Sequence, residues 1–120
     1  MSQQDFIFTL PGQLVRDYVP ELARRSAAGL VFDQAPSHQL EPLMARKIAE
    51  EAEEVITAQT PQESADRLAA VYELLEGLAR RRQLSMTDLA CRARELDVRK
   101  GPFQLGLVLV GKALNGGARS

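Results

Sequence analysis

The spacing of apolar and polar residues predicts several helices joined by short turns. Pro20 is suited to the first position of a helix, and the ELARRSAA run after it predicts a short helix ending near Gly29. Apolar residues at helical spacing then predict a long second helix, which begins at His38 or at Pro42 and ends near Ala58. These segments indicate an all-α protein.

Two further helices follow, and each begins at a recognisable cap. The run Thr60–Glu63 (TPQE) is a capping box with proline at the first helical position, so it predicts a third helix that reaches about Gln83. The run Ser85–Asp88 caps a fourth helix, and Gly101-Pro102 ends it. We therefore expect four helices.

Short apolar runs outside these helices predict extended segments. Phe6–Leu10 is expected to form an extended arm, and Leu30–Phe32 is a second short run. Gly106–Val110 (GLVLV) predicts a strand or a buried helical turn. No internal repeat or linker interrupts the chain. We expect one helical domain over residues 1–112 and a loose tail over residues 113–120.

Composition narrows the classes of function. The chain has 120 residues, 15 basic and 16 acidic, and this near balance argues against a general nucleic-acid binder. Cys91 is the single cysteine, so neither an intramolecular disulfide nor a cysteine-rich zinc site is expected. No apolar run is long enough to span a membrane, and Met1–Asp5 lacks the basic start of a signal peptide. We expect a cytoplasmic protein.

The charges are balanced in total but separated along the chain. Arg46–Glu54 contains two basic and four acidic residues, whereas Arg80–Lys100 contains seven basic and three acidic ones. One interpretation is that two solvated faces attract each other. The other is that the carboxylates hold a cation while the basic residues hold phosphate.

The acidic run lies along the edge of the predicted core of the second helix. Lys47, Glu51 and Glu54 share one flank, where the two carboxylates at positions i and i+3 repel each other. A hard cation such as Mg²⁺, which prefers oxygen ligands, would remove this repulsion. The alternative is an acidic face paired with Lys47 and nearby arginines. The core stripe itself is expected to consist of Met44, Ile48, Ala52 and Val55.

The acidic helix resembles that of a known enzyme superfamily. The run KIAEEAEEV (47–55) resembles the metal-binding helix of the MazG-like all-α nucleoside-triphosphate pyrophosphatases, which include phosphoribosyl-ATP pyrophosphohydrolase. LVRDYVPEL (14–22), ESADRLAAVYELLE (63–76) and RKGPFQLGLVLV (99–110) are similar, in the same order, to segments of a small house-cleaning branch of that superfamily.

The resemblance implies a fold and a reaction. It implies a dimeric or larger MazG-like helical bundle that cleaves a noncanonical nucleoside triphosphate into its monophosphate and pyrophosphate. It implies Mg²⁺, for which Mn²⁺ can substitute, with Glu51 and Glu54 as ligands and Glu50 as a ligand or the catalytic base that orients water. The residues expected to face the substrate phosphates are Arg16, Lys47, Arg99 and Lys100.

The second half of the implied metal site is ambiguous, because the superfamily supplies it as ExxD from the next helix. By local likeness, Glu63 and Asp66 are that pair, although both also suit the start of a helix. By antiparallel geometry, Arg67 and Ala70 face the carboxylates of the second helix, and Glu73 is the nearest remaining acid. The sequence leaves both alignments open.

Three functions therefore remain. The first is the Mg²⁺-dependent nucleotide pyrophosphohydrolase. The second is a degenerate relative that binds a nucleotide or a partner without catalysis, and the third is a helical homo-oligomeric interaction module. For all three we expect a homodimer or larger homo-oligomer, because Ala69, Ala70 and Gly77 would let another helix approach the third helix closely. The Leu68–Leu75 stripe, with Tyr72 beside it, is expected to be core.

Overall fold

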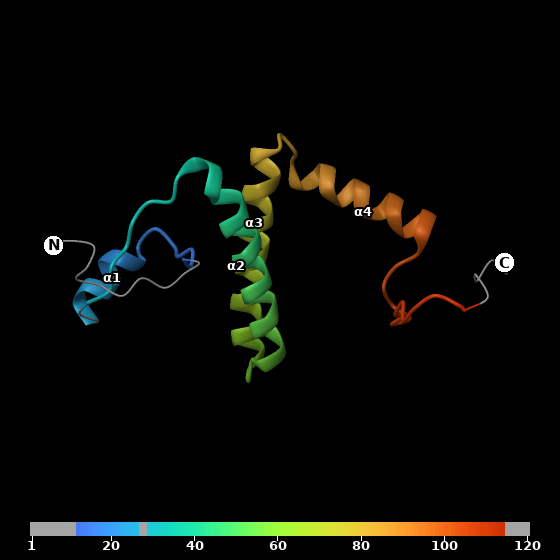
Figure 1. The fold of residues 1–120 in the computed structure, drawn as a ribbon, viewed down its shortest axis with the longest axis horizontal. Coiled ribbons are helices and arrows are strands. Elements are labelled where there is room, and N and C mark those ends of the chain that lie inside the picture. The colour runs from blue at the N-terminus through green and yellow to red at the C-terminus, as the bar shows by residue number, and fades with distance from the viewer. Residues whose placement is uncertain (1–11, 27–28, 115–120) are drawn as a thin grey trace. The chain divides into compact units, whose positions relative to one another are not determined.

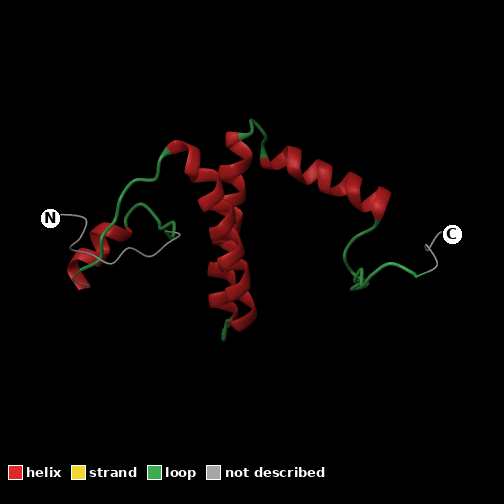
Figure 2. Ribbon diagram, in the orientation of Figure 1, coloured by secondary structure: helices red, strands yellow, loops and turns green. Residues whose placement is uncertain are grey.

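The computed structural model describes residues 12–26 and 29–114, and all regular secondary structure in these ranges is helical (Figures 1 and 2). This confirms the all-α prediction. The bundle and the oligomer implied by the resemblance stay predictions. The helices in the described ranges are α1 (Val19–Ser26), α2 (Ser37–Thr57), α3 (Pro61–Arg81) and α4 (Met86–Lys100).

The start of α3 follows directly from its sequence. Thr60 has an extended backbone, and its hydroxyl oxygen accepts a hydrogen bond from the Glu63 amide at 3.1 Å. The Glu63 carboxylate in turn accepts a hydrogen bond from the Thr60 amide at 3.0 Å. Pro61 occupies the first helical turn, where its missing N–H has no intrahelical partner to lose. The predicted capping box is therefore confirmed.

The first turns of α2 contain a proline. The helix begins at Ser37, close to the earlier of the two predicted starts, and continues through Pro42. Figure 1 shows that these first turns bend away from the rest of the helix. A proline ring crowds the carbonyl one turn earlier and cannot donate the usual hydrogen bond, which explains a bend at this point.

Helices α2 and α3 run antiparallel as a hairpin and provide the principal packing of the described chain (Figure 1). Met44 and Ala79 are its buried apolar residues. The contact is close because Gly77 has no side chain: a Cβ there would lie 2.7 Å from the Met44 Cε. Gly77 thus admits a helix of the same chain, a role that the sequence assigned to a second copy.

The face that α3 turns toward α2 differs from the predicted one. Leu68, Tyr72 and Leu75 are exposed rather than core. The half-buried residues of α3 on the side of α2 include Arg67, Val71, Leu74 and Leu78. The helix carries two apolar stripes at helical spacing, and the pattern alone does not decide which one meets α2.

The predicted core stripe of α2 is also shifted at one position. Met44 is buried and Ile48 and Val55 are half-buried, as expected, but Ala52 is exposed and Glu51 is buried in its place. This correction places a carboxylate where an alanine was expected. Its ion pairs, described below, explain how the charge is accommodated.

Arginines at the end of α3 tie it to the start of α2. Arg81 Nε lies 3.1 Å from one oxygen of Glu41, and Arg82 Nη2 lies 2.7 Å from the other. The hydrogen bond from Arg81 lowers the pKa of Glu41, because it favours the ionised carboxylate. These bonds help to fix the open end of the hairpin.

The packing divides the chain into two compact units, Met1–Ser85 and Met86–Ser120. In the second unit α4 ends at Gly101, whose positive φ of 84° suits glycine and whose amide donates to the Asp97 carbonyl at 2.9 Å. Gly106–Val110 is exposed and irregular, so the predicted strand or buried turn is wrong.

Several other predictions are not decided by the structure. The predicted Phe6–Leu10 arm lies outside the described residues, and the single domain over residues 1–112 stays a prediction. Within the described ranges no helix is both long and apolar enough to cross a membrane.

Replacing Thr60 by alanine removes the side-chain acceptor at the start of α3. We expect the Thr60→Ala variant to lose about 1 kcal/mol of unfolding free energy, measured by urea denaturation followed by circular dichroism. Thr60→Ser, which keeps a hydroxyl acceptor, is the control and should retain most of the stability. Equal midpoints for Thr60→Ala and the unaltered protein would contradict the role of the cap.

Candidate functional site

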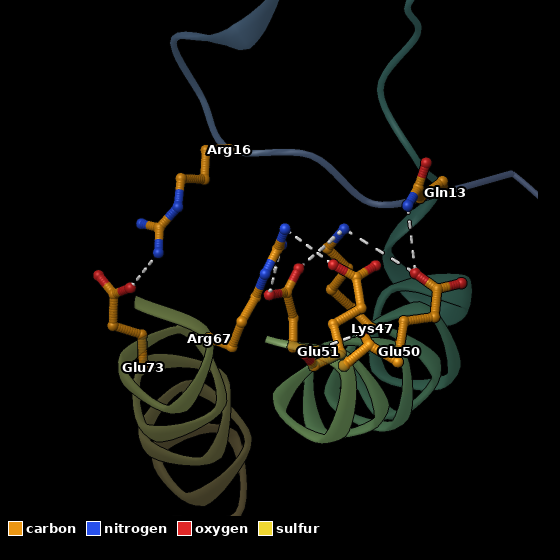
Figure 3. A network of polar contacts seen from close by, with 9 residues as sticks. Gln13, Arg16, Lys47, Glu50, Glu51, Arg67 and Glu73 are labelled. Carbon is orange, nitrogen blue, oxygen red and sulfur yellow. Dashed lines mark hydrogen bonds and ion pairs between the residues drawn. The ribbon is translucent and has the colours of Figure 1, made fainter. Parts of the chain in front are cut away.

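Charged side chains gather on one face of the α2–α3 hairpin (Figure 3). Alternating acids and bases from three segments of the chain contact one another there, and we call this group the polar cluster. Its members are Gln13, Arg16, Lys47, Glu50, Glu51, Glu54, Arg67 and Glu73.

Glu51 is the buried member of the polar cluster, with 6% of its surface exposed. Lys47, one turn earlier on α2, brings its Nζ to 3.3 Å from one carboxylate oxygen. Arg67 of α3 brings Nη1 to 3.2 Å from the other oxygen. Burial raises the pKa of Glu51, but the hydrogen bonds from Arg67 and Lys47 outweigh it and leave the pKa below its ordinary value.

Arg67 bridges two carboxylates of α2. Besides its contact with Glu51, its Nη2 lies 2.8 Å from an oxygen of Glu54. The hydrogen bond to Glu51 raises the pKa of Arg67. Glu51 and Glu54 are the i, i+3 pair whose repulsion suggested a bound cation, and the guanidinium supplies that positive charge from within the chain.

The segment that precedes α1 lies over the polar cluster (Figure 3). Gln13 Nε2 donates to Glu50 at 3.2 Å, and Arg16 Nη2 lies 2.5 Å from Glu73. The hydrogen bond from Arg16 lowers the pKa of Glu73. Glu50 also lies 3.8 Å from Lys47, so both carboxylates at the margins of the cluster have partners.

The donor set does not fit the Mg²⁺ that the resemblance implies. Each oxygen of Glu51 already faces a cation, and Glu54 shares Arg67. The residue opposite these carboxylates is a guanidinium, which repels a metal ion instead of binding it. Among the described residues no three acidic, histidine or cysteine side chains are grouped so that they could hold a metal. The predicted ligand set is therefore not assembled.

The remaining predicted site residues do not belong to the polar cluster. Glu63 is part of the capping box, and Asp66 is exposed. Arg99 and Lys100 occupy the last turn of α4, in the second compact unit. The structure thus follows the antiparallel alignment, in which Arg67 rather than an acid meets α2.

Sequence reasoning identified most of the polar cluster but not its full connectivity. Antiparallel geometry indicated Arg67, and the KxxEExxE spacing indicated the members on α2. Gln13 was missed as a contact. It lies 37 residues from Glu50 in the sequence, and no local pattern predicts a hydrogen bond over that separation.

Comparison with known proteins does not assign the chain to a family: no family model, curated protein or solved structure matches it. The resemblance to the MazG-like superfamily accordingly stays a prediction.

The stability of the hairpin should depend on the ionisation of Glu51. A carboxyl whose pKa is lowered by folding stabilises the fold above its unfolded-state pKa, and this contribution is lost as the pH falls through the folded value. We expect Glu51→Gln to lower the melting temperature at pH 7 by roughly 4–8 °C, which corresponds to about 1 kcal/mol. The difference should shrink below about pH 4.5, measured by thermal denaturation.

The control is Glu53→Gln, also on α2. Glu53 is exposed and forms no ion pair with any described residue, so its variant should melt like the unaltered protein at every pH. A difference between Glu51→Gln and the unaltered protein that stays constant from neutral to acid pH would refute the assignment.

Proposed function

We propose that this chain is a helical interaction module that does not hydrolyse nucleotides, with an internal ion-pair cluster where the resemblance implies a metal. The observation that carries the proposal is the Arg67 guanidinium, which bridges Glu51 and Glu54 at 3.2 and 2.8 Å. Of the functions that the sequence left open, this takes partner binding without catalysis from the second and the helical module from the third.

The charge of the polar cluster supports this proposal. Its three cations, Arg16, Lys47 and Arg67, nearly balance its four carboxylates. A site that binds Mg²⁺ through phosphate and carboxylates needs a local excess of negative oxygen ligands. A fixed guanidinium also cannot lower the pKa of a coordinated water, as a metal ion does. The polar cluster is therefore suited to holding helices together.

The apolar surface of the hairpin supports partner binding. Ile56 of α2 is 82% exposed, and Leu68 and Tyr72 of α3 are 54% and 55% exposed. Single exposed apolar residues are ordinary, but a group of them on one helical hairpin is typical of an interaction surface. We propose that this surface binds another helical surface.

The absence of metal-dependent hydrolysis is directly testable. We expect no pyrophosphate release above the blank from a panel of canonical and noncanonical nucleoside triphosphates with Mg²⁺ or Mn²⁺, measured by phosphate detection with added inorganic pyrophosphatase. Turnover that disappears in a Glu50→Gln variant would overturn the proposal and support the predicted pyrophosphohydrolase. A matched Glu53→Gln variant controls for the change of charge on α2.

A second test restores the acids that the resemblance places opposite α2. In the double variant Arg67→Glu, Ala70→Asp, unpaired carboxylates replace the ion pairs, so we expect a lower melting temperature without metal. Mg²⁺ should raise the melting temperature again, because binding adds about 2.7 kcal/mol to the free energy of unfolding when the Mg²⁺ concentration is 100 times the dissociation constant. The unaltered protein and Arg67→Ala should show no such rise. Equal stabilisation of the unaltered protein by Mg²⁺ would contradict the proposal.

A further inference from the structure

The hairpin carries two apolar stripes that face away from its own helix contact. The residues are spaced four, three and four apart on α2 and four and three apart on α3, which is the spacing of a helix–helix seam. The α2 stripe is small except at its end and comprises Ala45, Ala49, Ala52 and Ile56; the α3 stripe is large and comprises Leu68, Tyr72 and Leu75.

Both stripes lie on the same side of the hairpin. Ala49 directly follows Ile48, which faces α3, and Tyr72 directly follows Val71, which faces α2. One residue is a rotation of about 100°. The two helices face each other and run antiparallel. A step of one residue toward the C-terminus on either helix therefore turns from the contact face toward the same side of the hairpin, so both stripes lie on that side. The residues that directly precede the facing ones, such as Glu50 and Glu73, turn to the opposite side, where Figure 3 shows them.

The two sides of the hairpin differ in what covers them. The segment containing Gln13 and Arg16 contacts the polar side. On the apolar side, Ala45, Ala49 and Ala52 are exposed, and Leu75 is 40% exposed. We propose that a second copy of this chain covers the apolar side, related by a two-fold axis parallel to the helices. This inference rests on the proposed function and names its partner.

Shape complementarity selects this axis. Within the hairpin, Arg67 lies level with Glu54 and Gly77 with Met44, so Tyr72 lies level with Ala49. A two-fold axis parallel to the helices leaves each residue at the same height along the hairpin in both copies. It packs α3 of one copy against α2 of the other, and these two helices run antiparallel.

In this arrangement, the bulky residues of α3 in one copy contact the small residues of α2 in the other. Tyr72 packs over Ala49 of the second copy and Leu68 over Ala52. An axis perpendicular to the helices would instead stack the alanine-rich stripe on itself and the bulky stripe on itself, which leaves voids on one side and overlap on the other.

Charge complementarity points to the same arrangement. Arg46 flanks the α2 stripe, is exposed, and forms no ion pair with a residue that the structure describes. Glu76 flanks the α3 stripe and lies level with Ala45, beside Arg46 of the second copy. Its contact within the chain is a long one, 3.9 Å to Arg80. The two-fold axis creates this Arg46–Glu76 pair twice.

The size of the face suits a dimer. Each helix has 21 residues, so the hairpin is about 30 Å long and roughly 20 Å wide. The footprint of roughly 600 Å² per copy approaches the ~800 Å² that each partner buries in a stable interface.

The test is the mass of the full chain in solution, measured by light scattering over a range of concentrations. We expect the mass of two copies, and we expect Ala49→Arg, which places a charge in the seam, to give a monomer with unchanged helical circular dichroism. Gln62→Arg adds the same group to α3 outside the stripes and should stay dimeric. A monomeric unaltered protein, or an Ala49→Arg variant that remains dimeric, overturns the proposal.

A charge exchange tests the axis. Arg46→Glu alone and Glu76→Arg alone should each weaken the dimer by about tenfold, because two pairs become repulsive. The double variant should recover the original dissociation constant; failure to recover it overturns the arrangement of α3 on α2. A dimer that hydrolyses nucleotide would refute the proposed function alone, whereas a monomer without hydrolysis would refute only this inference.

Discussion

The hairpin depends on one buried charge. A carboxylate removed from water is costly unless cations and hydrogen bonds compensate it. Glu51 receives one cation from its own helix, Lys47, and one from the facing helix, Arg67. Because Arg67 must reach Glu51, the rotation of α3 is constrained. Val71 and Leu74 then turn toward α2, while the neighbouring apolar stripe stays exposed.

This rotation gives the hairpin two unlike sides. On the polar side, ion pairs hold the segment before α1 through Arg16 and Glu73. On the apolar side, large residues of α3 such as Tyr72 lie on the same side as small residues of α2 such as Ala49, and both are exposed. The first side holds the segment before α1, and the second is suited to a partner.

The cluster also illustrates how one residue changes the chemistry that a pattern suggests. Glu50, Glu51 and Glu54 have the spacing of metal-binding carboxylates. The guanidinium of Arg67 lies among these carboxylates and compensates their charge. Unlike a metal ion, a guanidinium does not coordinate a water molecule and cannot activate one. Arg67 thus supplies, from within the chain, the positive charge that a bound cation would supply beside Glu51 and Glu54.

The sequence by itself determined the helices, because their signals are local. Thr60 and Glu63 cap α3 across three residues, Gly101 ends α4, and apolar spacing marks α2. The same reasoning identified the acidic helix and offered Arg67 in one of two open alignments, between which the structure decided. Only the tertiary structure decided which stripe of α3 meets α2, that Glu51 is buried, and that Gln13 reaches Glu50. Two stripes of similar hydrophobicity leave the rotation of a helix undetermined until a charged pair across the interface selects one of them.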